Sequence, residues 1–502
     1  MTAANTLLRR LHDLARAAPN RIAVEDDTAK RSFADLMARA ERVRAALEER
    51  GLARRRVGLF ASPGASWVEA FVGSLLANCT AVALSPIYPA SELAFLLRTS
   101  ATSSVLVSRD LEAHARIVLE NTPTLVIEEL AATDARSKKQ ESFPRPNDAA
   151  LVLFTSGTTG KPKGAKLTHE NVLTLAEVLG RAWGFSSDDV LLHTLPLHHL
   201  HGIGVSLLVA LASGAMTRFV AFEPDRVWDE LGRATVLMGV PTQHKKLFDA
   251  FDAAGDDAKG IWASHGRALR LVTSGSAALP TAIGERWRAL SGTYPLERYG
   301  MTEIGIVLSN PLHGERRPRT VGTPLPGVEM RLVGDGESDV QAGDPGELWI
   351  RARTVFEGYD DNERATIDAL SGDWFKTGDT ARSSSDGYVT MLGRTSVDIL
   401  KSGGYKLSAV EIENVLREHD GVADVAVVGL PDDTWGDLVV AAIVERPGFT
   451  TSSDALRAWA RERIAPYKVP KRIVVLEDFP RNALGKVQKN TLVRLLIERG
   501  QT

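Results

Sequence analysis

Apolar and polar positions alternate along the first part of the chain with the periods of helices and buried strands. Residues 32–50 place apolar side chains on one helical face before Gly51, and Ser32 with Asp35 has the form of a capping box. The apolar runs that follow predict short elements at residues 57–61, 68–76, 81–84, 92–99 and 104–107. Strands that alternate with helices in this way are typical of parallel α/β layers.

The segment at residues 149–169 has a different pattern of residue types. An apolar run ends at Phe154 and gives way to a loop of Ser, Thr, Gly and Lys, after which a helical pattern begins with Thr168 as its N-cap. Glycines, hydroxyls and lysines in one loop suit a bound polyphosphate, because backbone N–H groups can approach closely and lysines offset charge. Gly157 and Gly160 are too close together for the common nucleotide-binding loop, and Pro162 follows Lys161.

Further along, the pattern predicts strands at 190–195, 236–239 and 269–273 and an apolar helix at 203–212. From about residue 320, short Gly-rich strand-and-turn units predict a β subdomain. After Arg394 we expect a smaller α+β unit. It has helices at 408–418, where Ser408 and Glu411 form a capping box, and at 454–464, with strands at 422–428, 438–444 and 473–476. The predicted fold is therefore α/β, with a large N-terminal domain of layered subdomains and a small α+β C-terminal domain.

Composition narrows the class of protein. A chain of 502 residues with 44% hydrophobic and 25% charged residues can form two or three globular units, and a net charge of −3 gives no nucleic-acid signal. The single cysteine, Cys79, cannot form an internal disulfide and indicates a reducing compartment. No uninterrupted apolar run of about 18 residues is present, so we expect a cytoplasmic protein without a membrane partner.

Taken singly, the polar motifs have structural explanations. The histidines at 198, 199 and 201 fit a polar turn, Tyr299 fits a core, Asp379 and Arg394 fit a structural ion pair, and Lys486 fits a surface lysine. Zinc binding by the histidines is not expected, because no carboxylate or cysteine lies at the usual spacing.

Their order along the chain is more specific. TSGTTGKPKG at 155–164, HHLHG at 198–202, SGSA at 274–277, YGMTE at 299–303, TGD at 377–379, GR at 393–394 and GK at 485–486 together resemble the adenylate-forming acyl-CoA synthetase superfamily. The resemblance implies an N-terminal domain at 1–393, a hinge at 394–398 and a mobile C-terminal domain at 399–502. It also implies two half-reactions: a carboxylate and ATP give an acyl adenylate and pyrophosphate, and the acyl group then passes to a thiol.

The resemblance also implies roles for individual residues. The phosphates of ATP would be held by Thr155, Ser156, Gly157, Thr158, Thr159 and Lys163. The rest of the nucleotide site would include Ser276, Tyr299 (stacked on adenine), Gly300, Met301, Thr302 (at the α-phosphate), and Asp379 and Arg394 (at the ribose). Glu303, with Thr159, would hold Mg²⁺, while Lys486 would bridge the carboxylate and the α-phosphate. The catalytic set would thus be Lys486, Thr302, Glu303 and His199.

Lys486 lies in the small domain, so that domain must close for adenylation and then reorient for thioester formation. In the family the pivot is often the Asp or Lys two residues after the arginine matching Arg394; here Ser396 stands there, with Asp398 two further on. CoA would be approached by Ser402, Gly403, Gly404 and Tyr405.

The expected acyl site comprises His199, His201, Gly202, Ser276, Ala277, Arg298 and Met301. Most family members have a small residue before the tyrosine of YGMTE, whereas this chain has Arg298, which suits a substrate with a second carboxylate. With HHLHG, SGSAALP and ERYGMTE, the local sequence resembles malonyl-CoA synthetases, with methylmalonate as a slower substrate. The alternatives are a CoA ligase for another short-chain or aromatic acid and a free-standing adenylation domain that loads a carrier protein; a carrier is not expected. A buried structural ion pair with Glu297 or another acid remains an alternative for Arg298.

Overall fold

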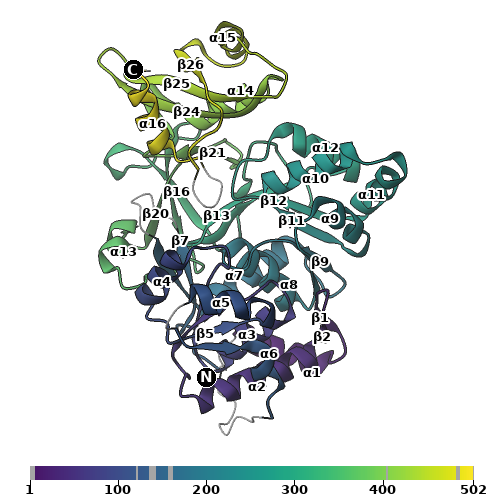
Figure 1. Cartoon of the computed structure of the whole chain (residues 1–502). Helices are drawn as coiled ribbons and strands as arrows, with labels where there is room; N and C mark the ends of the chain where they lie inside the picture. The colour runs from purple at the N-terminus through teal and green to yellow at the C-terminus, as the bar shows by residue number, and fades with distance from the viewer. Residues whose placement is uncertain are drawn as a thin grey trace. The chain divides into compact units, whose positions relative to one another are not determined.

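The computed structural model describes residues 6–119, 122–134, 143–155, 162–402, 405–481 and 487–500. The chain divides into two compact units. Unit 1 comprises Met1–Glu329 and Ile350–Phe375, and unit 2 comprises Met330–Trp349 and Lys376–Thr502. Figure 1 follows the chain through both.

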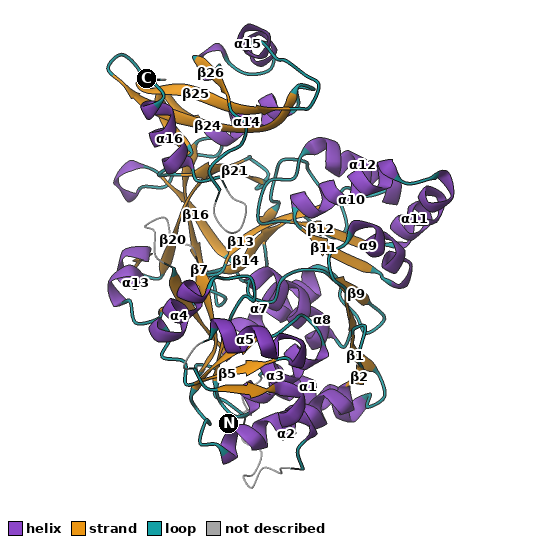
Figure 2. Cartoon of the chain, viewed as in Figure 1, coloured by secondary structure: helices purple, strands orange, loops and turns teal. Residues whose placement is uncertain are grey.

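Two large sheets form the framework of unit 1 (Figure 2), and both are parallel in their centres. The seven-stranded sheet is antiparallel at one edge, and the nine-stranded sheet is antiparallel at both. In order, the seven-stranded sheet contains β18 (Gly358–Tyr359), β8 (Lys163–Thr168), β7 (Ala149–Thr155), β4 (Thr80–Ala83), β3 (Arg56–Phe60), β5 (Ser104–Val107) and β6 (Thr124–Val126). The nine-stranded sheet contains β15 (Thr323–Pro324), β14 (Gly305–Ser309), β13 (Leu296–Met301), β12 (Leu271–Ser274), β11 (Val236–Gly239), β9 (Val190–His193), β10 (Met216–Phe219), β1 (Ile22–Glu25) and β2 (Lys30–Ser32). The predicted parallel α/β layers are confirmed.

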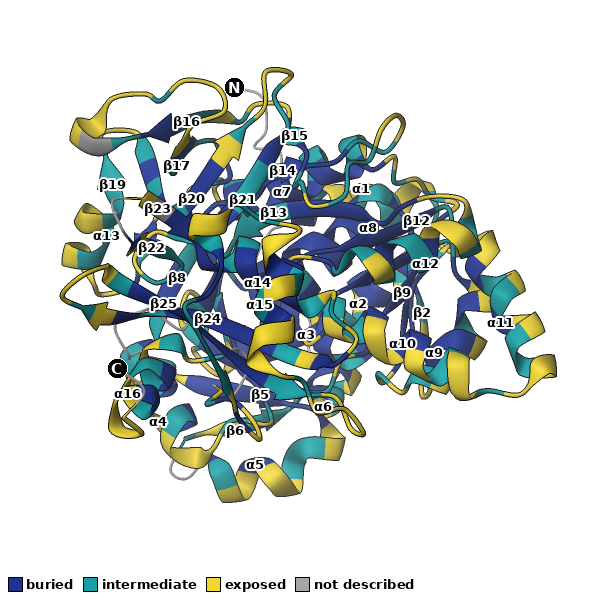
Figure 3. Ribbon diagram, turned by 90° about the horizontal axis from the view of Figure 1, so that it is seen from above, coloured by how far each residue is buried: buried dark blue, intermediate teal, exposed yellow. Residues whose placement is uncertain are grey.

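Helices pack on these sheets and close the cores. They are α1 (Leu7–Ala17), α2 (Phe33–Glu49), α3 (Ala65–Leu76), α4 (Ala90–Thr99), α5 (Glu112–Val118), α6 (Ile127–Ala132), α7 (His169–Ala182), α8 (Leu208–Ser213), α9 (Pro224–Glu230), α10 (Pro241–Ala253), α11 (Asp256–Ala268), α12 (Thr281–Ser291) and α13 (Glu363–Ala369). An aromatic core around Trp228, Trp262 and Trp287 joins α9–α12 to strands β9, β11 and β12. Burial by such packing supplies most of the stability of helices of this length. Exposed positions gather on outlying helices such as α5 and α11 (Figure 3).

The predicted helix caps, which depend on residues close together in the sequence, are confirmed at α2 and α7. Ser32 caps α2 and forms the predicted capping box with Asp35, and Thr168 caps α7 by accepting from the Asn171 backbone N–H. One expectation is wrong. The Gly- and Lys-rich loop does not lead directly into the helix, because residues 163–168 form strand β8, which pairs antiparallel with β7 from Ala149↔Thr168 to Thr155↔Lys163. Thr155 and Lys163, on either side of the segment that is not described, are therefore paired strand residues.

Unit 2 contains two smaller sheets. The first is built mainly from β16 (Glu329–Val333), β17 (Pro345–Arg351), β20 (Trp374–Ser383) and β21 (Val389–Arg394), and β19 (Leu370–Ser371) pairs with the start of β20. The second contains β23 (Tyr405–Ser408), β22 (Ile399–Ser402), β25 (Gly436–Glu445), β24 (Val422–Asp432) and β26 (Arg472–Val475). Helices α14 (Ala409–Arg417) and α15 (Ser453–Arg461) belong to one hydrophobic core, and α16 (Lys489–Glu498) to another. Ser408 caps α14, as predicted, but Glu411 does not complete the predicted capping box, because its carboxylate accepts from Lys468 Nζ at 2.6 and 2.7 Å.

The compact units do not coincide with the predicted division at 394–398, because β16, β17, β20 and β21 pack in unit 2. Packing and motion are different properties, so the hinge remains a prediction. No helix in the described part of the chain combines the length and apolar character that a membrane span requires.

Candidate active site

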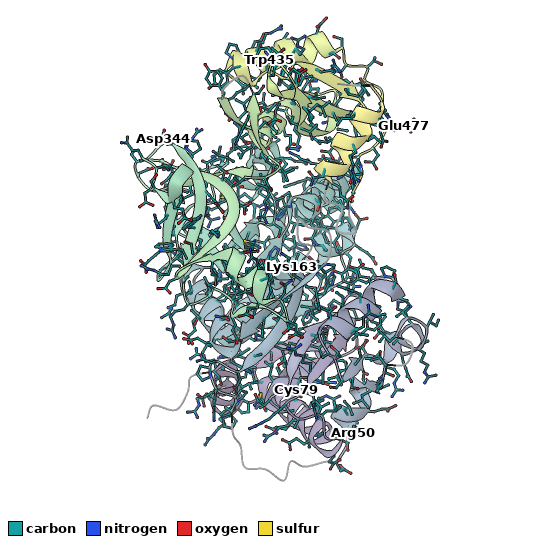
Figure 4. All side chains as sticks on the ribbon, turned by 90° about the vertical axis from the view of Figure 1, so that its left-hand side faces the viewer. Arg50, Cys79, Lys163, Asp344, Trp435 and Glu477 are labelled. Atoms are coloured by element: carbon teal, nitrogen blue, oxygen red, sulfur yellow. The ribbon has the colours of Figure 1, made fainter. Side chains whose placement is uncertain are left out.

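The paired ends of β7 and β8 bring three predicted residues together within unit 1. The Thr155 hydroxyl, at the end of β7, donates to Glu303 Oε1 at 3.3 Å. The Tyr359 hydroxyl donates to the same oxygen at 2.9 Å, and Lys163 Nζ lies 5.2 Å from the centre of the Tyr359 ring (Lys163 is labelled in Figure 4). Glu303 is only 4% exposed. One carboxylate, two hydroxyls and a lysine therefore surround the stem of the phosphate-type loop.

A partly buried ion pair lies next to this arrangement. The Arg56 guanidinium, on β3, binds Asp360 with two nitrogens at 2.6 Å each. The Asp360 backbone N–H donates to the Gly164 carbonyl at 2.7 Å, so the pair ties β8 to the edge strand β18. A bidentate Arg–carboxylate pair has a fixed geometry, and this one orients the backbone next to Lys163. Neither Tyr359 nor Asp360 was predicted as a site residue; both come from a segment with no recognisable motif.

Strand β13 carries the next group of predicted residues. Tyr299, Gly300 and Met301 are half-buried near its end, beside a bulge between Tyr299 and Gly300, and Thr302 follows. Ser276, after the neighbouring strand β12, is exposed and has a φ of +67°, a left-handed conformation that is uncommon for a residue with a side chain. Such strained positions cluster at functional sites.

Arg298 is the most unusual residue of β13. It is 5% exposed, and its Nε and Nη2 atoms are buried with no hydrogen-bond partner among the described residues. Gly275 lies against the guanidinium, since a Cβ at that position would be 2.3 Å from Arg298 Cζ. Burial lowers the pKa of Arg298 to about 10, so the group remains a cation at neutral pH. By the relation between pKa and free energy, this desolvation costs about 3 kcal/mol.

The alternative of a structural pair with Glu297 does not hold. Successive residues of a strand point to opposite faces, and the Glu297 carboxylate accepts from the backbone N–H groups of Leu279 and Arg319, each at 3.3 Å. Burial raises the pKa of Glu297 to about 7. No ion pair to Arg298 exists among the residues that the structure describes.

Histidines held in the neutral form accompany Arg298. Both ring nitrogens of His201 are buried without a described partner, and burial, followed by the positive charge of Arg298, lowers its pKa well below the usual value. His201 begins the π-helix His201–Leu207, a rare element often found at functional sites. Burial lowers the pKa of His193 and of His244 to about 4; His193 pairs with the Gly202 carbonyl at 2.9 Å, and His244 with the Thr273 carbonyl at 3.1 Å. The region thus carries one permanent cation.

His199, the predicted catalytic histidine, is half-buried, and its ring centre lies 4.2 Å from that of His198. Burial lowers the pKa of His198 to about 3, which leaves its ring neutral. Among described residues, no group of three His, Cys, Asp or Glu side chains could hold a metal ion by itself.

In unit 2, Asp379 and Arg394 face each other on paired strands. Arg394 Nε lies 3.1 Å from Asp379 Oδ1, and Arg394 Nη1 donates to the Thr377 carbonyl at 2.7 Å. The guanidinium is 39% exposed. A partly open ion pair of this kind stabilises little on its own and can bind a polar ligand with both groups oriented.

The predicted CoA segment lies on an aromatic edge of unit 2. Ser402 is buried, and Tyr405, 54% exposed, stacks on Tyr467 with ring centres 4.4 Å apart. Trp435, which Figure 4 shows at the surface of this unit, has Lys471 Nζ 4.2 Å from its ring centre. Ser402 pairs with both Tyr405 and Gly436, so the Tyr405 stack and the turn that contains Trp435 lie at the same end of these strands.

Several predicted residues cannot be placed. Ser156, Gly157, Thr158, Thr159, Gly403, Gly404 and Lys486 lie outside the described residues. A groove of about 1,110 Å³ along α7 contains none of the predicted residues. Within it Glu170 pairs with Arg353 and Glu177 with Arg181.

Comparison with known proteins agrees with this geometry. Residues 11–360 match the model of the AMP-binding enzyme family, and residues 411–486 match that of the AMP-binding enzyme C-terminal domain. The mitochondrial malonate–CoA ligase ACSF3 of Homo sapiens is 38% identical over 95% of this chain and 90% of its own length. The malonate–CoA ligase of Arabidopsis thaliana is 36% identical over 88% of this chain and 78% of its own.

Solved structures are similar over nearly the whole chain. The crystal structure of ATP-bound MatB from Rhodopseudomonas palustris has a TM-score of 0.88 at 32% identity and covers 98% of both chains. An anthranilate CoA ligase, AuaEII, bound to anthranoyl-AMP has a TM-score of 0.87 at 25% identity, covering 100% of this chain and 99% of that one. The chain belongs to the AMP-binding enzyme family and is an adenylate-forming acyl-CoA synthetase, a ligase that uses ATP and CoA.

Proposed function

We propose that the chain joins malonate to CoA, with ATP converted to AMP and pyrophosphate through a malonyl adenylate. The observation that carries this choice of acid is the buried guanidinium of Arg298, whose Nε and Nη2 atoms have no hydrogen-bond partner among the described residues. A desolvated cation without an anion is unfavourable, and a substrate with a second carboxylate would supply that anion. The names of the human and Arabidopsis relatives support the same acid.

His201 fits the same role. Its neutral imidazole adds hydrogen-bonding capacity next to Arg298 without a second full charge. One carboxylate of malonate would pair with the fork of Arg298, and the other would face the α-phosphate of ATP as the nucleophile. Methylmalonate differs by one methyl group, and we expect it to react more slowly.

For ATP, we propose that the loop at 155–164 holds the β- and γ-phosphates and that Tyr299 stacks on adenine. Asp379 and Arg394 would bind the ribose hydroxyls. Glu303 with the hydroxyls of Thr155 and Tyr359 is an all-oxygen donor set that fits Mg²⁺, which proteins hold through one or two carboxylates and phosphate oxygens. When bound, Mg²⁺ would offset the charge of the leaving pyrophosphate.

Adenylation needs positive charge more than it needs proton transfer, because an anion attacks an anionic phosphate. We propose that Lys486 carries that charge at the reacting carboxylate and α-phosphate. Thr302 would donate to the α-phosphate, and His199 would line the acyl site. The domain containing Lys486 would then turn about the segment 394–398 and present Ser402–Tyr405 to CoA. The stacked Tyr405 and Tyr467 and the Trp435–Lys471 pair would offer flat and cationic surfaces to its nucleotide end.

ATP–pyrophosphate exchange across a panel of acids tests the proposal. Malonate should give the fastest exchange, with methylmalonate slower and acetate, butyrate, benzoate and anthranilate far behind. Equal or faster exchange with any monocarboxylate would reject the dicarboxylate assignment and favour a ligase for that acid. Replacement of CoA by a carrier protein in the full assay separates the two thiol acceptors. A cytoplasmic location remains a prediction.

A further inference from the structure

A buried lysine with two carboxylate partners lies at the start of α16. Lys489 Nζ is 2.5 Å from Asp398 Oδ1 and 2.6 Å from Glu413 Oε1. All three side chains are at most 14% exposed. Glu413 also accepts from the Val427 backbone N–H at 2.7 Å, which fixes the cluster to β24.

Asp398 also makes hydrogen bonds to the backbone of Arg394. Its Oδ2 accepts from the Arg394 backbone N–H at 2.9 Å, and its own N–H donates to the Arg394 carbonyl at 2.7 Å. The two bonds close the turn from Arg394 to Asp398 at both ends. Gly393, with a φ of +117°, leaves room for this, since a Cβ there would lie 2.4 Å from Asp398 Cβ. The turn is therefore shaped around one side chain.

The residues on either side of this turn are anchored to different elements. Thr395 N–H donates to the Gly378 carbonyl at 2.9 Å, and the Thr395 and Thr380 hydroxyls lie 2.8 Å apart, which ties the first side to β20. The Asp398 carbonyl accepts from the Ala409 N–H at 2.8 Å, which ties the second side to α14. Between these anchors lie only Ser396 and Val397. The Val397 N–H donates to the Arg394 carbonyl at 3.2 Å, so neither residue is bonded to β20 or α14 through its backbone N–H in the described part of the chain.

We propose that Lys489 is a positioning residue for the domain rotation: by holding Asp398, it sets the turn at the Ser396–Val397 pivot and ties it to α16. The inference rests on the proposed two-step function, in which this segment is the hinge. Lys489 follows Lys486 by three residues in the sequence, so the helix that continues from the catalytic lysine would be fastened to the pivot. Buried ionic groups are best attested as devices that select one arrangement over others rather than as sources of stability.

The consequence is kinetic. When Lys489 binds Asp398, the turn at Ser396–Val397 has a fixed conformation in each domain arrangement, and the small domain reaches the geometry of each half-reaction efficiently. When Lys489 is replaced, Asp398 keeps its bonds to the turn but loses its attachment to α16. The rates of the two half-reactions should then change by different factors.

The test measures the two half-reactions separately. Adenylation is followed as malonate-dependent ATP–pyrophosphate exchange, and thioester formation as malonyl-CoA production from supplied malonyl-AMP and CoA. Lys489→Met and Asp398→Asn should each change the ratio of the two rates by about tenfold or more, and the double variant should match the single ones within about twofold, because both break one interaction. Lys489→Arg, which keeps the charge, should restore the ratio.

Leu496→Ala is the matched control, because this fully buried residue lies on the same helix and does not touch Asp398. It should slow both half-reactions in the same proportion. An unchanged ratio in both Lys489→Met and Asp398→Asn would overturn the inference; if Lys489→Met does not fold, Asp398→Asn decides. Absence of both half-reactions in the unaltered protein with malonate would instead reject the proposed function.

Discussion

Two of the cations that the described part of the fold withdraws from solvent, Arg298 and the largely buried Lys489, have opposite surroundings. Arg298, in unit 1, has two guanidinium nitrogens without a described partner, whereas Lys489, in unit 2, has two carboxylates within 2.6 Å. Burial lowers the pKa of Arg298, while Asp398 and Glu413 outweigh burial and raise the pKa of Lys489. The comparison teaches that burial alone does not identify a binding residue. We infer that a buried cation without an anion binds an anionic ligand, whereas a buried cation with two anions fixes the arrangement of the protein around it.

The first way to break this comparison is to remove each charge and measure stability. Lys489→Met should lower the free energy of unfolding by about 3–5 kcal/mol, because it leaves buried carboxylates unpaired. Arg298→Met should leave stability unchanged or raise it, because it removes an uncompensated charge. Urea denaturation followed by tryptophan fluorescence measures both. An equal loss in the two variants would show that Arg298 has a protein partner after all.

For the use of malonate the order of the two residues should be reversed, with Arg298 the more important. Arg298→Ala should lower kcat/KM for malonate roughly 30- to 5,000-fold, which corresponds to about 2–5 kcal/mol of transition-state stabilisation, if Arg298 pairs with a desolvated carboxylate. Exchange with any monocarboxylate that binds should be spared. Arg298→Lys is the control, since it keeps the charge but loses the fork. A uniform loss with all acids would assign Arg298 to structure instead of specificity.

A third cation, Lys486, should act on one step only. Lys486→Ala should slow adenylation by about 100- to 1,000-fold, the cost of removing one charge-stabilising group at a transition state. Thioester formation from supplied malonyl-AMP should remain nearly intact, because the charge is needed only while the adenylate forms. Single-turnover assays of each half-reaction decide this. Equal loss in both contradicts the assigned role.

The smallest effect concerns the neutral histidines beside Arg298. His193 and His244 have pKa values of about 4 in the fold, so between pH 6.5 and 5 only the unfolded chain takes up their protons. Stability should therefore fall as the pH falls, by about 1.4 kcal/mol per pH unit for each histidine. Glu297, with its pKa raised to about 7, opposes one of the two.

Thermal unfolding as a function of pH measures this slope. His193→Gln keeps a donor for the Gly202 carbonyl without an ionisable ring, and the slope should be smaller by about one histidine's share. A slope that does not change on this substitution would place the proton uptake elsewhere.

How much of this site the sequence could predict depended on how local the interaction is. The caps at Ser32, Thr168 and Ser408 act over three residues and were predicted correctly. Strand β8 was missed because its six residues become a strand only by pairing with β7. Arg298 was singled out by its position, but its lack of a partner depends on Glu297 facing the other side of β13.

Long-range contacts were beyond prediction. Arg56 and Asp360 are 304 residues apart in the sequence, and no local pattern announces their pairing. The same is true of Lys489 and Asp398, which are 91 residues apart. Motif resemblance could assign a role to Glu303, but only the fold shows that the Tyr359 hydroxyl shares its carboxylate oxygen.

Gly275 has a consequence for how such enzymes diverge. The guanidinium of Arg298 occupies the space that any side chain at position 275 would need. A larger residue at position 275 would require the guanidinium to move from its present place. The two positions should therefore be inherited together, and a relative with the arginine but a larger residue at the first position should not be assumed to share the same acid.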